Sequence, residues 1–357
     1  MARTLTDLLG IDRPIVLGPF GGLSSVALTA AVSTAGGLGS YGLYGYDGAR
    51  IRDTIASLRA ATARPFAVNL WLPTGDEVTP DAVDLRPLTA ALAPVFAELG
   101  TEPPKPPEPT KAPEPPARFL PDIDEQLDAV LAARPAALSV VYGVPSPDLI
   151  AAARQRGIAV IGTATTVAEA RALADAGVDA VVATGAEAAG HRVSFLQPAE
   201  RSLVGTFALV PQVVDAVEVP VIAAGGIADR RGVAAAFALG AAGVQVGTAF
   251  LRTRQSAATA GHRAAIAAAA DDSTVLTRAM SGRLARGIPN RAMELLEAAP
   301  VLPFPAQNWL TGRFRTPAAA QGRSDLVSQW AGQAAALAHH DDADDVFAEL
   351  AAGLQRG

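Results

Sequence analysis

Cysteine is absent from the 357-residue chain. This absence excludes disulfide bonds, thiolate ligands for zinc or an iron–sulfur cluster, and a cysteine nucleophile. The chain also has no run of about 20 apolar residues, the length that a membrane-spanning helix needs. Its N-terminus has no basic segment followed by an apolar one, as a secretory signal peptide does. We therefore expect a soluble protein of the cytoplasm.

Positive charge is scarce as well. The sequence has 29 lysines and arginines against 35 aspartates and glutamates, which gives a formal net charge of −6. Proteins that bind nucleic acids or anionic membranes need clustered Lys and Arg, so we expect neither partner. The sequence has no HExxH motif and no carboxylates at metal-ligand spacing, so we expect no metal site. The partner that we expect is a small-molecule substrate.

Short apolar runs rich in Val, Ile and Leu recur along the chain, and each is followed by a segment with helical periodicity. Runs that are apolar on both faces are typical of parallel strands covered by helices. Eight such alternations predict an α/β protein with a (β/α)8 TIM barrel. An open Rossmann-like sheet is the alternative, but no early run is followed by GxGxxG. The predicted strands are 14–18, 37–41, 66–70, 137–142, 158–162, 179–183, 219–224 and 243–247.

The alternation stops near residue 250. We predict that the barrel occupies residues 1–255, that 256–335 form a smaller, mainly helical lid or substrate-binding region, and that 336–357 return to the barrel as a helix. Residues 101–121 are rich in proline and charge, and we expect an extended polyproline-like excursion there. A solvent-exposed linker is the preferred interpretation, and a ligand for a PxxP-reading domain is the alternative.

Residues 219–251 place glycines after two consecutive predicted strands, at Gly225 and Gly226 and again within 245–248. The loops after strands seven and eight of TIM barrels commonly bind phosphate through backbone N–H groups and a helix N-terminus. Glycine lets the backbone approach an anion closely, and the hydroxyl of Thr248 adds a donor. The pattern predicts a phosphate site, with two tight turns as the alternative.

Histidine occurs only four times. His191 belongs to the segment 183–192, which directly follows the sixth predicted strand, and this places it at the barrel mouth, where TIM-barrel chemistry occurs. Its imidazole is a candidate general base or acid, and a structural histidine is the alternative. We expect His262 on the surface of a lid helix, and His339 and His340 at a solvated helix start.

Two further segments end predicted strands at the same mouth. Asn69 has an amide that can donate and accept hydrogen bonds, so it is a candidate ligand contact, and a local turn is the alternative. Residues 18–22 form a glycine-bracketed loop that would let backbone groups reach a flat ligand.

Taken in order, these motifs resemble the nitronate monooxygenase family, the flavoenzymes once called 2-nitropropane dioxygenases. The resemblance covers nearly the whole chain and rests on GPFGGL, AVNLW, GAEAAGHR, VIAAGGIADRRGV, VQVGTAFL, TRAMSGRLARGIPNR and PFPAQN. It implies a barrel that holds FMN, with the phosphate at Gly226 and 245–248, and His191 as the catalytic base. The residues it assigns to FMN binding are Gly18, Phe20, Gly21, Asn69, Thr184, Ala189, Gly225, Gly226, Gln245, Val246, Gly247 and Thr248.

The resemblance also implies a reaction. Alkyl nitronates, and nitroalkanes from which His191 removes a proton, would be oxidised with O2 to a carbonyl compound and nitrite. The flavin would supply the redox chemistry, and the protein would supply placement and electrostatics. The alternatives are an NAD(P)H-dependent flavin reductase of the same superfamily, of the enoyl-acyl-carrier-protein reductase or quinone reductase type, and a flavin-binding barrel without turnover. A homodimer is a further expectation.

The chain departs from the family pattern around the expected flavin. The family usually has glutamine where this chain has Thr184 and glycine where it has Ala189. Methionine is common where this chain has Phe20, and many bacterial members have a second histidine where it has Val141. These replacements predict a less polar pocket than the family's best-characterised members have.

Overall fold

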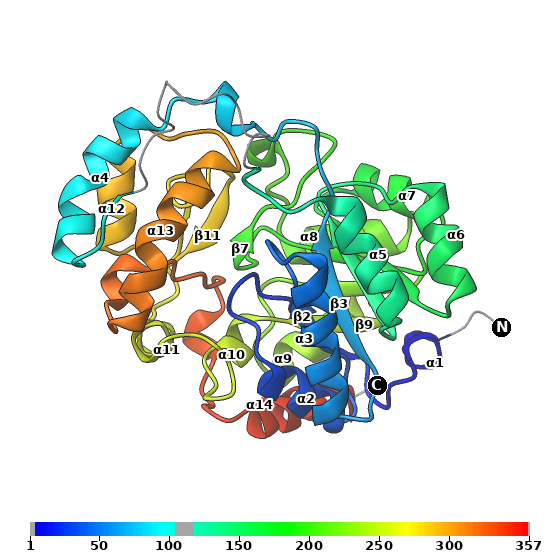
Figure 1. Cartoon of the computed structure of the whole chain (residues 1–357). Coiled ribbons are helices and arrows are strands. Elements are labelled where there is room, and N and C mark those ends of the chain that lie inside the picture. Colours follow the sequence, from blue (N-terminus) through cyan, green and yellow to red (C-terminus); the bar gives the residue numbers. More distant parts are fainter. Residues whose placement is uncertain (1–3, 104–117, 356–357) are drawn as a thin grey trace.

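A computed structural model describes residues 4–103 and 118–355, and its centre is a barrel of eight parallel strands (Figure 1). Neighbouring strands follow the order β1-β9-β8-β6-β5-β4-β3-β2. A parallel bridge between Val16 and Leu38 links the two ends of this order, so the barrel is nearly closed. Each predicted run overlaps one observed strand, and the TIM-barrel prediction is confirmed. The strands are β1 Ile15–Leu17, β2 Gly39–Gly42, β3 Phe66–Trp71, β4 Ala137–Val141, β5 Ala159–Ala164, β6 Ala180–Thr184, β8 Val221–Ala224 and β9 Gly243–Val246.

Helices surround the barrel and shield the apolar runs from water. Several begin at a side chain that accepts a hydrogen bond from a first-turn N–H, as Ser25, Asp47 and Thr166 do. The strands are buried because the helices cover their outer face and side chains fill the interior. The helices on the barrel side are α1 Leu5–Leu9, α2 Val26–Thr34, α3 Gly48–Ala61, α5 Ile123–Ala133, α6 Pro147–Gln155, α7 Val167–Asp175, α8 Thr206–Val214, α9 Arg230–Ala238 and α10 Thr248–Leu251.

A smaller lobe lies beside the barrel and has a core of its own, which includes Phe96, Met293 and Phe314 (Figure 1). Most of its elements are helices. The structure adds α4, which leaves the barrel between β3 and β4 and packs in the lobe. The elements of the lobe are α4 Arg86–Glu98, α11 Ala260–Ala267, α12 Arg291–Glu297, α13 Ala306–Ala320, and a three-stranded sheet of β10 Val275–Thr277, β11 Ala285–Gly287 and β7 Gly190–His191.

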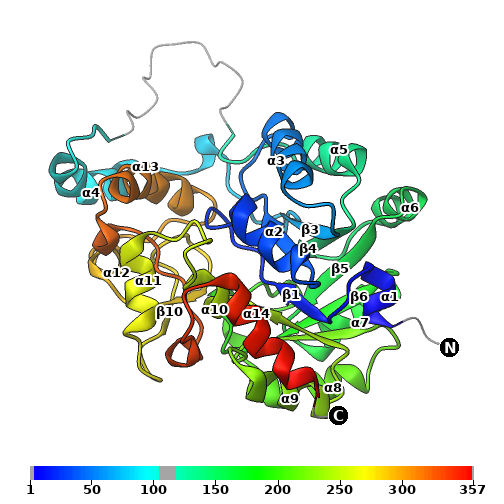
Figure 2. The same ribbon diagram turned by 90° about the horizontal axis from the view of Figure 1, so that it is seen from below.

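The last helix, α14 (Ala343–Ala351), returns to the barrel and packs against α2 and α9 (Figure 2). Most of the proline-rich segment predicted over 101–121 lies outside the described residues. Within the described ranges, no helix combines the length and apolar character required to cross a membrane. Short 3-10 helices complete the chain at Pro80–Ala82, Ala199–Arg201, Ser324–Leu326, Ala335–Leu337 and Ala352–Gln355.

Candidate active site

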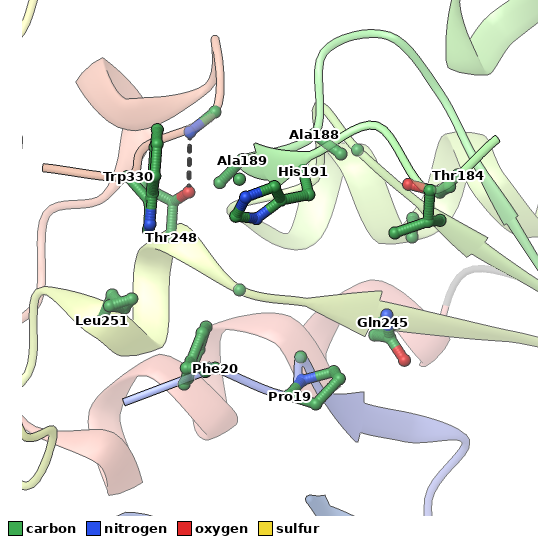
Figure 3. Close-up of a pocket in the computed structure, with 18 of the residues that line it drawn as sticks. Pro19, Phe20, Thr184, Ala188, Ala189, His191, Gln245, Thr248, Leu251 and Trp330 are labelled. Carbon is green, nitrogen blue, oxygen red and sulfur yellow. Dashed lines mark hydrogen bonds between the residues drawn. The ribbon is translucent and has the colours of Figure 1, made fainter. Parts of the chain in front are cut away.

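A cavity of about 380 Å³ opens at the carboxyl ends of the barrel strands and is closed on one side by the smaller lobe. Figure 3 shows His191, Thr184 and Gln245 around this space. His191 and every residue predicted to contact FMN, with the exception of Val246, line the cavity. The topology of the barrel explains this convergence, because the carboxyl ends of parallel strands meet at one rim.

Val246 differs from the expectation. Its side chain is fully buried in the hydrophobic core and does not line the cavity. Side chains alternate along a strand, so Gln245 and Gly247 border the cavity while Val246, between them, does not.

The loops after β8 and β9 present free backbone donors to the cavity. The N–H groups of Gly226, Gly247 and Thr248 have no acceptor among the described residues. Thr248 Oγ1 accepts a hydrogen bond of 2.9 Å from the N–H of Gly332, so its own hydroxyl proton is free to donate (Figure 3). Gly226 has a φ of +71°, which favours glycine. Converging donors without acceptors suit a phosphate group.

The predicted helix N-terminus contributes less than expected to this cradle. The helix that follows β9 is α10, which spans only Thr248–Leu251. A helix of one turn has a small macrodipole, so the individual N–H groups carry the attraction for an anion.

Asn69 offers a defined acceptor at the cavity. Its Nδ2 donates to the carbonyl oxygen and to Oγ of Ser139, at 3.2 and 2.8 Å. A carbonyl oxygen only accepts, so the amide orientation is fixed and Oδ1 is left for a ligand N–H. The hydroxyl of Thr184 and the amide of Gln245 have no partner among the described residues. Acceptors and donors of this kind match the N–H and C=O edge of a flat heterocycle, so these residues fit FMN.

The loop between β6 and β7 is held by two charged side chains. Buried Arg192 donates to the carbonyl oxygens of Gly185 and Thr184, at 2.6 and 3.2 Å. Glu187 accepts from both the N–H and the hydroxyl of Thr206, the first residue of α8. These bonds fix the backbone that leads into His191.

His191 lies in β7, where it pairs with Ala285 of β11 in the smaller lobe. Its ring packs edge-on against Trp71 and Trp330, with ring centroids 4.9 and 5.4 Å away. Its Nε2 lies 2.8 Å from Oγ of Ser281. The barrel and the lobe therefore hold this imidazole jointly.

The surroundings keep His191 neutral. Burial, followed by the positive charges of Arg283 and Arg315, lowers its pKa from the usual 6.5 to about 3. Desolvation and nearby cations both disfavour the imidazolium. At pH 7 the ring can therefore accept a proton, but the resulting charge is stable only beside a compensating anion.

Hydrogen-bond accounting assigns the tautomer of His191. Ser281 Oγ lies 3.1 Å from the carbonyl oxygen of Arg283, for which no other donor is found among the described residues. When the hydroxyl donates there, Nε2 of His191 must carry the proton that it shares with Ser281. This arrangement pairs every group and leaves the Nδ1 lone pair as the proton acceptor.

The expectation for His262 is wrong, because its side chain is buried, with 1% of its surface exposed. Its Nε2 lies 3.0 Å from the carbonyl oxygen of Trp330, the residue whose ring packs on His191. Helical periodicity alone did not show that this face of α11 turns into the lobe. Burial also lowers the pKa of His262 to about 4.

Sequence reasoning missed several residues that line the cavity: Tyr44, Trp71, Asn308, Arg315 and Trp330. Trp71 and Asn308 lie inside the AVNLW and PFPAQN motifs, which could have identified them. Arg315 and Trp330 come from the C-terminal region, and only the packing of the lobe brings them to the barrel mouth. Within the described residues, no group of three or more metal-ligating side chains is present.

Comparison with known proteins agrees with this geometry. The family described as nitronate monooxygenase matches residues 2–353. Probable nitronate monooxygenase from Staphylococcus aureus (strain JH9) is 38% identical over 354 residues, covering 97% of this chain and 95% of the relative. The same product name and identity apply to the relative from strain N315.

Two solved structures extend the comparison. Nitroalkane oxidase from Streptomyces ansochromogenes superposes with a TM-score of 0.85 at 36% identity, covering 98% of this chain and 97% of that one. FabK from Thermotoga maritima superposes with a TM-score of 0.73 at 29% identity, covering 99% and 97%. The family match and the relatives cover nearly the full length of this chain, so the similarity includes the barrel and the smaller lobe. The chain belongs to the nitronate monooxygenase family.

Proposed function

We propose that this protein binds FMN and oxidises alkyl nitronates with O2 to a carbonyl compound and nitrite. Family membership and the similarity to a nitroalkane oxidase support an oxidoreductase of this kind. The single observation that carries the choice of substrate is the charge of the cavity. A neutral imidazole stands there near the guanidinium of Arg315, which lines the cavity and has no ion-pair partner among the described residues, and this arrangement favours an anion over an uncharged molecule.

FMN would supply the redox chemistry at this site. The N–H groups of Gly226, Gly247 and Thr248 would hold its phosphate, and Asn69 Oδ1 would accept from its ring. This assignment rests on unpaired donors and acceptors that line one cavity.

His191 has a different task for each kind of substrate. A preformed nitronate is already an anion and needs no base, so His191 would only contact and orient it. A neutral nitroalkane must lose the proton on the carbon next to the nitro group, and His191 would accept it at Nδ1. The depressed pKa makes the imidazole a weak base, so the structure favours nitronates over nitroalkanes.

Anaerobic mixing of the FMN-loaded protein with butane-1-nitronate, and separately with NADH and NADPH, tests this proposal. We expect the flavin absorbance to change with the nitronate and to stay constant with either nicotinamide. Reduction by a nicotinamide alone would contradict the proposal and favour the flavin reductase alternative. Protein that binds no FMN would refute the cofactor assignment.

A further inference from the structure

Three polar side chains that line the cavity lie outside the proposed FMN cradle and form no hydrogen bond with His191. Tyr44 follows β2 in the barrel, whereas Asn308 and Arg315 lie seven residues apart on α13 of the lobe. Hydrogen bonds link them in the order Arg315, Asn308, Tyr44. Tyr44, the last residue of this series, lines the cavity in which a ligand would bind.

Arg315 brings a positive charge that the protein does not neutralise. Its guanidinium donates to Oδ1 and to the carbonyl oxygen of Asn308, at 2.7 and 3.1 Å, and to Oγ of Ser328 at 2.9 Å, and its enclosed Nε has no acceptor. No ion pair of the described residues includes Arg315. The contrast is Arg283, which pairs with Asp76 and Glu77, each at 2.8 Å. An unpaired guanidinium beside a cavity is a site for an anion.

The directions of the hydrogen bonds follow from chemistry alone. Arginine can only donate, so the group of Asn308 that faces Arg315 must be its oxygen. The amide nitrogen of Asn308 therefore points to Tyr44 and donates to its Oη at 3.0 Å. Tyr44 Oη has become the acceptor, so its own proton is free. No described residue accepts that proton, and Tyr44 lines the cavity.

One ring contact and the burial of the hydroxyl make the phenol of Tyr44 a stable hydrogen-bond donor. The ring of Trp71 packs on the ring of Tyr44, with centroids 4.3 Å apart, and holds its direction. Burial raises the pKa of Tyr44 to about 12, so the hydroxyl keeps its proton at neutral pH.

We infer that Tyr44 Oη–H and the unpaired charge of Arg315, oriented through Asn308, form an oxyanion subsite for the substrate. The group bound is a negatively charged oxygen of the substrate, either on the nitronate or on a carboxylate elsewhere in the same molecule. This inference rests on the proposed function and names the residues that would select an anionic substrate.

The substitution Asn308→Asp tests the relay with almost no change of shape. A carboxylate only accepts, so Tyr44 would donate to it and turn its proton away from the cavity. The same carboxylate would form an ion pair with Arg315 and neutralise its charge. The substitution therefore removes both the Tyr44 donor and the unpaired charge of Arg315 from the subsite, while it adds an ion pair to the fold. Tyr44→Phe deletes the donor alone and serves as the second variant.

The first readout is binding, and it does not depend on turnover. Calorimetry on the FMN-loaded protein compares butanoate with butanamide, which has the same shape without the charge. A hydrogen bond to a charged group accounts for about tenfold or more in affinity. We expect both variants to weaken butanoate binding by about that factor, and to leave butanamide within twofold.

Steady-state kinetics then identify the source of the anion. A raised KM for butane-1-nitronate assigns the subsite to the nitronate oxygens. A raised KM only for a nitronate with a carboxylate at its other end assigns it to that carboxylate. Butanoate affinity within twofold of the wild type, in folded variants that keep FMN, would overturn the inference. A wild-type protein that oxidises no nitronate would refute the proposed function, while the butanoate comparison would still decide the subsite.

Discussion

The phosphate cradle can be tested by adding one charge at Gly226. We compare Gly226→Asp with Gly226→Asn, because the two side chains have the same size and Asn and Asp both tolerate a positive φ. A Cβ at this position meets only Glu187, at 3.7 Å, so there is room for either side chain. The φ of +71° strains both variants to a similar degree. The difference between them therefore isolates the carboxylate charge.

The size of that difference follows from Coulomb's law. Two unit charges about 4 Å apart repel by about 4 kcal/mol at an effective dielectric constant of about 20. Each 1.4 kcal/mol corresponds to about tenfold in affinity, so the carboxylate should weaken FMN binding by about 100- to 1000-fold relative to Asn. The side chain nearest to a Cβ at Gly226 is the negatively charged Glu187, so it would not neutralise the added carboxylate.

The assay is equilibrium binding of FMN to the apoprotein, followed by the change in flavin absorbance or fluorescence. We expect Gly226→Asn to keep most of the wild-type affinity and Gly226→Asp to lose it. Added salt should narrow the gap, because ions screen the repulsion. Equal affinities of the two variants at low salt would show that the phosphate lies elsewhere.

Three more predictions concern the histidines. His191→Asn should retain FMN and slow nitroalkane oxidation at least tenfold more than nitronate oxidation, and equal losses in stopped-flow assays would refute the role of base. Ser281→Ala should shift the tautomer of His191, measured by nitrogen-15 NMR of labelled histidine, while an unchanged spectrum would exclude Ser281 as its anchor. Buried His262 has a pKa of about 4 in the folded state and about 6.5 in the unfolded chain, so the unfolded chain binds more protons between these values. Protonation of His262 in the unfolded chain should therefore lower the free energy of unfolding by about 2 kcal/mol between neutral pH and pH 5. His262→Gln should flatten the pH dependence of thermal unfolding.

Much of the barrel was predictable because parallel strands covered by helices leave a continuous apolar run in the sequence. Each predicted run overlaps a strand, and the periodic segments between them are helices. The loops at the mouth were predictable for a related reason. Once the strand order is known, residues near the carboxyl ends of strands, such as Asn69 in β3 and Gly226 after β8, must gather at one rim.

The errors have physical causes. His262 was expected on the surface, because an amphipathic helix does not reveal what packs against it. The contact of Val246 with FMN stays a prediction, although alternation along β9 turns its side chain into the core. The helix α4 was not expected in the smaller lobe, because a covalent position between β3 and β4 does not determine which core a helix joins.

The sequence by itself determined the fold class, the family and the glycine loops, because these depend on local periodicity and on residues adjacent along the chain. Only the tertiary structure decided the charge of the cavity. Arg315 reaches His191 and Tyr44 across more than 100 and more than 250 residues of chain, and burial changes the proton affinity of each group. Electrostatics depends on distance and desolvation in space, and neither can be measured along a sequence.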